Sequence, residues 1–422
     1  MPTDVTTLPA RELAHLRGRT VWALVASVAL GSTGHIAAVT VSTIVARELA
    51  GSAEWSGAPG AAVVLGAALG AVVLAWIMVR RGRRVGLASG YTIGVGGAVL
   101  ATGAIVVGSL PLLLLGTLLV GFGNAANQLS RYAAADLYPA ARRASAIGTV
   151  VWGATIGAVV GPNLVAPAGV VAESLGLPVL AGAYLVPILF VGAAAILCFI
   201  ALRPDPFDLA DDAVRELAGA AHPIRVSMAS LLSRPNVPVA MVALIAGQVV
   251  MVLIMTMTPL HMTDHGHDLA AVGIVISGHT FGMFGLSPIS GRLTDRYGNI
   301  PIILAGLLVS ASSAILAAVA PPDGGVTLFI ALFLLGYGWN LGFVAGSTLL
   351  TTGLTLEERT RLQGVTEALI WSSAAAASLG SGVVVAAASY ATLGLLGAAL
   401  IVGPVVLVIA RRSALTPPAA PV

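Results

Sequence analysis

Charged residues and cysteine are scarce in this sequence of 422 residues. Only 9% of the residues are Asp, Glu, Lys or Arg, and none of them is Lys, whereas soluble domains carry about 25% charged residues. So few charges cannot cover the surface of an aqueous globule of this length, and most of the surface must therefore face lipid. The arginines are scattered and form no basic face with aromatic residues, which excludes nucleic acid as a partner. A single cysteine, Cys198, excludes an internal disulfide.

The motifs of common enzyme classes are also missing. The sequence contains no phosphate-binding loop of the Walker type, no G-x-S-x-G nucleophile motif and no H-E-x-x-H zinc motif. We therefore expect no catalytic residue, no cofactor and no enzyme activity. The chain is rich in apolar residues. Of all its residues, 57% are hydrophobic, and its mean hydropathy is +0.97.

Apolar runs long enough to cross a bilayer recur through the whole chain. A helix needs about 20 residues for one crossing of the hydrocarbon core. The first run follows a polar start and is interpreted as a retained helix, not as a cleaved signal peptide. The sequence predicts an all-α membrane protein with twelve transmembrane helices, at residues 20–43, 57–79, 86–108, 111–134, 145–170, 176–202, 237–262, 268–290, 300–320, 325–352, 364–388 and 390–411.

The placement of arginine predicts how these helices are oriented, because short cytoplasmic loops are enriched in basic residues. With the N-terminus in the cytoplasm, 20 of the 21 arginines fall on the cytoplasmic side and only Arg47 falls outside. Both termini are then cytoplasmic, in a multi-pass protein of the bacterial inner membrane.

The stretch between the sixth and seventh runs differs from its surroundings, because it is rich in acidic residues and proline. We interpret it as a water-exposed linker between two six-helix bundles, with a short surface helix possible from Asp211 to Ala221. The expected segments are a cytoplasmic tail at 1–19, a bundle at 20–202, the cytoplasmic linker at 203–236, a second bundle at 237–411 and a tail at 412–422.

The two halves of the chain repeat each other with an offset of 216 residues. Gly82 in "RRGRR" corresponds to Gly298 in "DRYGN", and Arg143 in "RRASAIG" corresponds to Arg359 in "ERTRLQG". Two separate loops in one register predict duplicated six-helix units, an arrangement in which transporters build a site near the midplane of the bilayer.

The loop sequence from Gly291 to Asn299, "GRLTDRYGN", resembles the loop signature of the major facilitator superfamily, G-x-x-x-D-R-x-G-R-R. The resemblance implies two pseudo-symmetric six-helix bundles, alternating access and a gradient rather than ATP as the driving force. We expect Asp295 to cap a neighbouring helix and Arg296 to pair with it. The first-half copy has Val79 in place of the acid. The predicted gating residues are Gly291, Asp295, Arg296 and Gly298, with Arg80, Gly82 and Arg83 from the first copy.

A second pattern, on the fifth predicted helix, leaves two interpretations open. Gly157, Gly161 and Pro162 resemble the g-x-x-x-G-P signature that exporters of this superfamily often carry, yet glycines four residues apart also suffice for close helix packing. Exporters place an arginine where this chain has Thr117. Titratable groups that could couple transport to protons are His35, His279 and Glu367.

Methionine and histidine gather on the seventh and eighth predicted helices. Five of nine Met and four of seven His lie within residues 251–283. A spacing of four residues places Met251 and Met255 on one helix face, and His279 and Met283 on another. Thioether and imidazole groups form a soft ligand set that suits Cu(I).

This Met/His pattern resembles the CcoA-like copper importers of the same superfamily, which implies that Met251, Met255, His279 and Met283 bind the metal as substrate. The repeat places His35 in the position that corresponds to Met251, so His35 is predicted to join the substrate site. Methionine as core filler and a histidine bonded to a backbone carbonyl are the alternatives. The predicted function is copper import by a monomer, or else proton-coupled export of small organic compounds.

Overall fold

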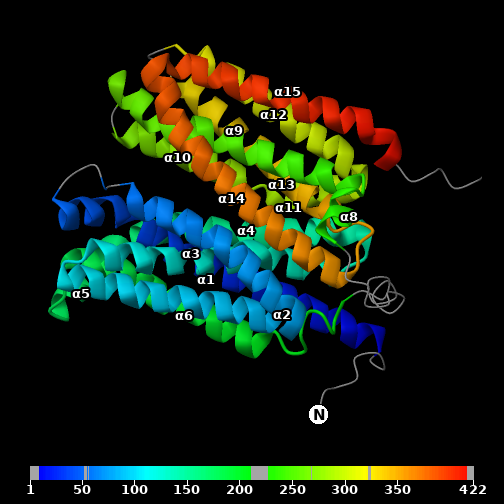
Figure 1. Cartoon of the computed structure of the whole chain (residues 1–422), viewed down its shortest axis with the longest axis horizontal. Helices are drawn as coiled ribbons and strands as arrows, with labels where there is room; N and C mark the ends of the chain where they lie inside the picture. The colour runs from blue at the N-terminus through cyan, green and yellow to red at the C-terminus, as the bar shows by residue number, and fades with distance from the viewer. Residues whose placement is uncertain are drawn as a thin grey trace, which may run out of the picture. The chain divides into compact units, whose positions relative to one another are not determined.

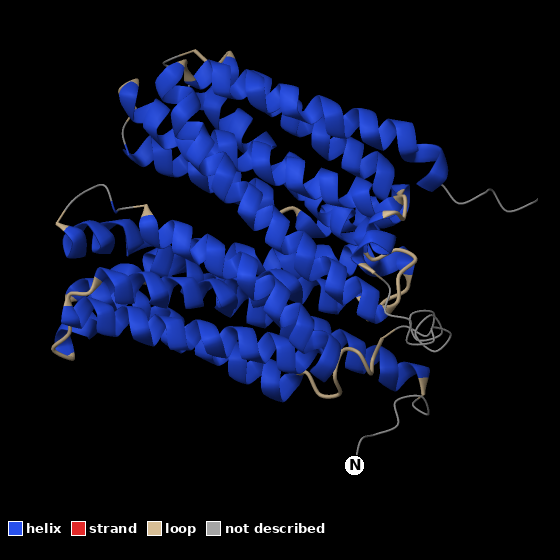
Figure 2. Ribbon diagram, in the orientation of Figure 1, coloured by secondary structure: helices blue, strands red, loops and turns tan. Residues whose placement is uncertain are grey.

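The computed structural model of the chain is helical throughout the part that it describes, with no strand in that part (Figure 2). It describes residues 9–51, 55, 57–210, 227–267, 269–321 and 325–415. The surface helix predicted from Asp211 to Ala221 lies outside these residues.

In the first half of the chain, the described residues form helices and short 3₁₀ turns, drawn from blue to green in Figure 1. They are α1 (Ala10–Ala50), α2 (Ala58–Val107), α3 (Leu110–Ala135), η3 (Ala140–Arg142), α4 (Arg143–Asn163), α5 (Val165–Ser174), η4 (Val179–Ala181) and α6 (Gly182–Ala201). Helix α1 therefore begins inside the stretch that the sequence analysis assigned to the N-terminal tail.

The second half repeats this arrangement. Its helices are α8 (Met228–Leu232), α9 (Asn236–Asp264), α10 (Leu269–Phe284), α11 (Ser287–Tyr297), α12 (Asn299–Ala318), α13 (Gly325–Leu350), α14 (Leu356–Ala387) and α15 (Tyr390–Leu415).

Twelve membrane crossings follow from these elements. Among the described residues, ten helices are long and apolar enough to span a bilayer. One of them, α2, is two helices joined at Gly82, whose backbone is not helical. Helices α10 and α11 together supply one more crossing, interrupted at Gly285 and Leu286. The prediction of an all-α protein with twelve transmembrane helices is confirmed.

The internal repeat is visible in the backbone. Gly82 has φ 86° and ψ 168°, and Gly298 has φ 88° and ψ 165°, a conformation that only glycine adopts without strain. A side chain at Gly148 would collide with the backbone of Ser287, and one at Gly364 with the backbone of Ala71. The offset of 216 residues relates Gly148 to Gly364 and Ala71 to Ser287. The two halves therefore repeat the same close contact between helix backbones.

The chain divides into two compact units, which do not coincide with the two halves of the sequence. The first unit contains residues 1–139, 149–221 and 355–372, and the second contains 140–148, 222–354 and 373–422. Each unit thus combines most of one half with a short segment of the other half. These short segments are residues 140–148, which include the start of α4, and residues 355–372, which include the first part of α14.

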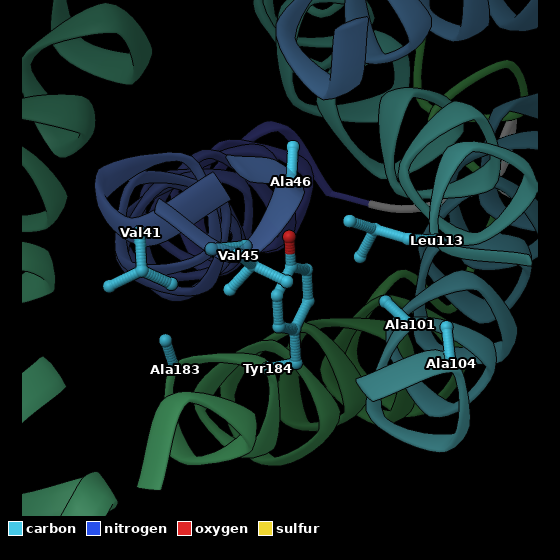
Figure 3. Close-up of a cluster of buried hydrophobic side chains, with 9 residues drawn as sticks. Val41, Val45, Ala46, Ala101, Ala104, Leu113, Ala183 and Tyr184 are labelled. Carbon is cyan, nitrogen blue, oxygen red and sulfur yellow. The ribbon is translucent and has the colours of Figure 1, made fainter. Parts of the chain in front are cut away.

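Small side chains build the interior of the first unit. Figure 3 shows the ring of Tyr184 on α6 beside Val45 of α1, with Ala101 and Ala104 of α2 and Leu113 of α3 nearby. All five side chains are buried. Because lipid does not drive helices together as water does, helices in a bilayer associate through close packing, which small residues permit.

Candidate substrate and coupling sites

The Asp295 carboxylate lies at the start of α4, within the second unit. Its Oδ1 accepts the N–H of Ala144 at 3.1 Å, and its Oδ2 accepts the N–H of Ser145 at 3.0 Å. These donors belong to the first turn of α4 and have no partner inside that helix, and a negative charge there is favourable. Gly291 lets α11 approach, because a Cβ at this position would lie 2.5 Å from the Ala144 carbonyl oxygen.

Arg296 does not make the expected pair with Asp295 in the described part of the chain. Its side chain is exposed, and its guanidinium carbon lies 5.3 Å from the ring centre of Tyr297. Asp295 therefore holds α4 through backbone N–H groups, and Arg296 is left on the surface next to the turn at Gly298.

The first copy of the loop signature replaces the missing acid by a local cap. Where the repeat would need an acid at position 79 to cap α14, the Thr355 N–H donates to Glu358 Oε2 at 2.9 Å, and the Glu358 N–H donates to Thr355 Oγ1 at 3.3 Å. This reciprocal arrangement is a capping box, which satisfies two donors at a helix start. Val79 is thus tolerated because α14 caps itself.

The turn at Gly82 is held by an acid that the sequence analysis did not assign. Asp205, in the loop after α6, accepts the N–H groups of Arg83 at 3.1 Å and Arg84 at 3.0 Å. Burial raises the pKa of the Asp205 carboxyl, although these backbone N–H donors oppose the rise. Arg80 lies outside this turn, with its guanidinium 3.9 Å from the ring centre of Trp76.

A buried charge cluster joins α2, α3 and α14 in the first unit. The Arg83 guanidinium is fully buried and donates to Asp136 Oδ2 from Nη2 at 2.8 Å and from Nε at 3.1 Å. The same Nη2 donates to Gln363 Oε1 at 2.8 Å. Arg359 Nη1 lies 3.7 Å from Asp136 Oδ1. Asp136 is therefore shared by two arginines, and Gln363 extends the cluster along α14.

A second buried pair lies one helical turn further along α14. The Arg131 guanidinium of α3 forms a salt bridge and hydrogen bond with Glu367 Oε1, and both side chains are 2% exposed. The Tyr132 hydroxyl contacts the Glu367 carboxylate at 3.3 Å and accepts from Arg131 at 3.0 Å. Arg131 also donates to the backbone carbonyl of Gln128. Every charge in this pair is thus compensated.

Residues Arg359, Gln363 and Glu367 follow each other at intervals of four and therefore share one face of α14; we call them the α14 polar stripe. Gly364 lies beside this stripe and lets α14 touch the backbone of α2 at Ala71. Glu367 was predicted as a titratable group, whereas Arg131, near the end of the predicted helix at 111–134, was counted only among the cytoplasmic arginines. The four-residue spacing is the signal that would have revealed the stripe.

The second unit contains an aromatic cluster halfway along α13. The Trp339 indole N–H donates to Gln248 Oε1 of α9 at 2.8 Å. The Phe343 ring stacks on Trp339 with ring centres 4.3 Å apart, and Phe284 meets Trp339 edge-on at 5.9 Å. We call Gln248, Phe284, Trp339 and Phe343 the Trp339 cluster.

The break between α10 and α11 is stabilised by one asparagine. Asn340 donates to the backbone carbonyl of Met283 and to the Ser287 hydroxyl, both at 2.6 Å, and accepts from the Ser290 hydroxyl at 2.5 Å. An interrupted helix in lipid requires such partners for its freed backbone groups. The repeat equivalent of Asn340 is Asn124, whose amide nitrogen is buried without a hydrogen-bond partner among the described residues.

The predicted Met/His residues lie along α9 and α10 on either side of α13. His279 is fully buried, and its Nδ1 lies 2.8 Å from the Leu332 carbonyl oxygen. The hydrogen bond between Gln248 and Trp339 places these two residues of α9 and the antiparallel helix α13 at the same depth. Met255 lies seven residues after Gln248, and Leu332, the partner of His279, lies seven residues before Trp339. On antiparallel helices these two shifts run in the same direction, so Met255 and His279 lie at similar depth.

The three methionines of the predicted metal set differ in burial. Met251 is buried, whereas Met255 and Met283 are half-buried. The described residues contain no group of three or more His, Cys, Asp or Glu side chains arranged to hold a metal ion. Metal binding through thioethers therefore remains a prediction.

His35 belongs to α1 in the first unit, whereas Met251 belongs to the second unit. His35 is half-buried, and its Nδ1 has no hydrogen-bond partner in the described part of the chain. Its participation in a shared site therefore stays a prediction.

The glycines of the exporter-like signature pack against α1. A Cβ at Gly157 would lie 2.6 Å from the Thr33 nitrogen, and one at Gly161 would lie 2.9 Å from the Thr33 carbonyl oxygen. Pro162 follows at the end of α4. Close helix packing accounts for the spacing. Thr117 donates to carbonyls of its own helix, those of Leu113 and Leu114.

Twelve apolar crossings in two repeated sets, with buried polar clusters between helices, define the class of polytopic membrane transporters. A sequence model of the Major Facilitator Superfamily matches residues 21–379 and, separately, 239–421. The chain belongs to the major facilitator superfamily. This membership also confirms that the chain is a transporter and not an enzyme.

Three relatives are similar over nearly the whole chain. The uncharacterized MFS-type transporters YdeG and YddS of Bacillus subtilis are each 36% identical, over 90% and 93% of this chain and 89% and 91% of their own lengths. The riboflavin transporter RfnT of Brucella anthropi is 29% identical over 89% of this chain and 91% of its own. None of these three is named for copper, so they do not support the resemblance to copper importers.

Solved structures of the same fold are distant in sequence. The fucose:proton symporter FucP of E. coli superposes with a TM-score of 0.70 at 15% identity, covering 93% of this chain and 98% of its own. The human organic anion transporter MFSD10 gives a TM-score of 0.72 at 14% identity, covering 93% and 99%. At these identities the likeness establishes the fold alone.

Proposed function

We propose that this protein is a secondary active transporter that works by alternating access and carries a small organic solute with a flat ring system. The observation that carries the proposal is the Trp339 cluster. It presents aromatic rings and an amide group halfway along α9 and α13, at the depth where transporters of this architecture bind their substrates.

The chemistry of the cluster suits such a solute. Aromatic faces attract other flat rings by stacking, and ligand sites are typically apolar walls with a few placed polar groups. The hydrogen bond from the Trp339 indole to Gln248 fixes the orientation of the largest ring. Similarity to a riboflavin transporter over 89% of this chain supports the same solute class, so riboflavin is the first solute to test.

The test is uptake of labelled riboflavin by bacteria that can neither make nor import it and that express this protein. Trp339→Leu should abolish uptake, and Trp339→Phe should retain part of it because one aromatic face remains. Trp22→Leu is the matched control, because Trp22 is 62% exposed on α1. Absence of uptake by the wild type, or uptake that survives Trp339→Leu at equal expression, would remove the proposal.

A second candidate is copper import through Met251, Met255, His279 and Met283. It is favoured by the setting of His279, whose Nδ1 is held by the Leu332 carbonyl while its Nε2 has no hydrogen-bond partner among the described residues. Metal-binding histidines are commonly oriented in this way.

Radiolabelled copper uptake tests this candidate. Met251→Leu conserves volume and apolarity, so loss of uptake would identify the sulfur as the required group, and His279→Ala should have the same effect. Met241→Leu is the matched control, since Met241 is also buried on α9 but stands outside the pattern. Equal copper uptake in all variants excludes the Met/His site.

A further inference from the structure

We propose that His261 and His265, at the end of α9, form a binding site for a divalent transition metal ion such as Zn²⁺. Both residues lie in the second unit. Neither belongs to the Trp339 cluster or to the four Met/His residues of the copper candidate, so the site is separate from both proposed transport functions.

The spacing of the two histidines places them on one face of the helix end, because residues four apart are neighbours there. Helix α9 ends at Asp264, and His265 follows directly. The imidazole rings of His261 and His265 are 4.3 Å apart between their centres and tilted by 54°. Two nitrogens that share one tetrahedral zinc ion lie about 3.4 Å apart. Rings at the observed separation can therefore each direct one nitrogen to a common ion.

A backbone contact orients the ring of His265. Its Nδ1 lies 2.7 Å from the His261 carbonyl oxygen. A carbonyl oxygen only accepts hydrogen bonds, so Nδ1 carries the hydrogen and the neutral ring presents the lone pair of Nε2. Metal-binding histidines are commonly held in this way. The His265 side chain is exposed, so an ion can reach it from water.

The ring of His261 is held by Tyr390, the first residue of α15. The two rings are stacked, with centres 4.2 Å apart and planes 9° from parallel. The Tyr390 hydroxyl is hydrogen-bonded to the Thr258 hydroxyl at 2.8 Å, one turn before His261 on α9. Tyr390 and Thr258 are buried. His261 is thus fixed before any ion binds, which lowers the entropic cost of binding.

The surroundings of the histidine pair favour a cation. Asp264 lies between the two histidines in sequence and interacts electrostatically with His261. The C-terminal end of a helix carries a partial negative charge, and the pair lies at that end of α9. Imidazole ligands suit Zn²⁺, Ni²⁺ and Cu²⁺ more than Mg²⁺ or Ca²⁺.

A third histidine, His267, faces a different neighbour. Gly266 has φ 80°, a left-handed conformation that suits glycine and turns the chain after His265. A Cβ at Gly325 of α13 would lie 3.3 Å from His267 Cε1, which places the His267 ring against the start of α13. Since the described residues hold no group of three or more such ligands, the ion has two histidine ligands and takes the others from water.

Zinc binding to the purified full-length protein, with any affinity tag removed, is measured by calorimetry. The wild type should bind Zn²⁺ through this site. His265→Gln should weaken the binding about tenfold or more, because one of the two protein ligands is lost. His267→Gln is the matched control and should bind zinc as the wild type does.

His261→Gln should weaken zinc binding as His265→Gln does. Thermal unfolding without zinc shows whether loss of the ring stacked on Tyr390 disturbs the fold. If it does, His265→Gln still decides, because the His265 side chain is exposed.

Electron paramagnetic resonance of added Cu²⁺ identifies the ligands. The nitrogen splitting should indicate two nitrogens in the wild type and in His279→Ala, and one in His265→Gln. Retention of the signal in His279→Ala separates this site from the copper candidate. A wild type that binds no zinc, or a His265→Gln variant that binds zinc with wild-type affinity, overturns the proposal.

Discussion

At the scale of single residues, the repeat supplies matched pairs whose members differ in their surroundings. Asn340 satisfies the backbone at the break between α10 and α11, whereas Asn124, its equivalent, has an amide nitrogen without a partner in the described part of the chain. The same residue type at the same repeat position thus has a structural task in one half and none visible in the other.

We predict that Asn340→Ala lowers the free energy of unfolding by about 1–3 kcal/mol, because it leaves the Met283 carbonyl and the Ser287 hydroxyl unsatisfied. Asn124→Ala should change stability much less, since its amide nitrogen donates no hydrogen bond to lose. Thermal unfolding of the purified variants in one detergent measures both. Equal losses in the two variants would show that Asn340 does not stabilise the break.

The Glu367 pair marks the limit of residue-level prediction from sequence. Glu367 could be recognised as an acid inside an apolar run, but its partner Arg131 lies 236 residues away along the chain. Arg131 falls near the end of the predicted helix at 111–134, but nothing in the local pattern shows that it pairs with an acid, because that contact depends on the packing of α14 against α3.

At the scale of helices, hydropathy predicted nearly every crossing, because an apolar helix in lipid needs about 20 apolar residues whatever its neighbours are. The break at Gly285 and Leu286 was not predicted, since every one of the twelve runs contains glycine and the contacts of Asn340 that stabilise the interruption come from another helix. The correspondence of the loop glycines Gly82 and Gly298 was predicted from the repeat, and their matching backbone conformations agree with it.

The start of α4 depends on Asp295, and we predict that Asp295→Asn impairs transport without preventing membrane insertion. Loss of a charge at a helix start costs about 1 kcal/mol, which is roughly a fivefold change in a conformational population. Initial uptake rates at equal membrane expression measure the effect. Asp264→Asn, at the exposed end of α9, is the control, and an uptake rate that Asp295→Asn leaves unchanged would refute a gating role.

At the scale of the whole molecule, the arrangement of arginines predicts that both termini and residues 203–236 face the cytoplasm. A cysteine placed at Asp208 in a Cys198→Ala background should react with a membrane-impermeant thiol reagent only after the cells are opened. Reaction in intact cells would reverse the orientation. Cys198 is the single native cysteine, so its replacement leaves the introduced cysteine as the one thiol that can react.

The central claim is that the Trp339 cluster binds a flat solute that the protein then carries across the membrane. The most direct measurement is binding and uptake of labelled riboflavin by proteoliposomes containing the purified wild type, Trp339→Leu or Trp22→Leu. We predict saturable uptake in the wild type and in Trp22→Leu, and neither binding nor uptake in Trp339→Leu. Uptake that Trp339→Leu retains, or wild-type vesicles that take up no more than empty ones, would contradict the account.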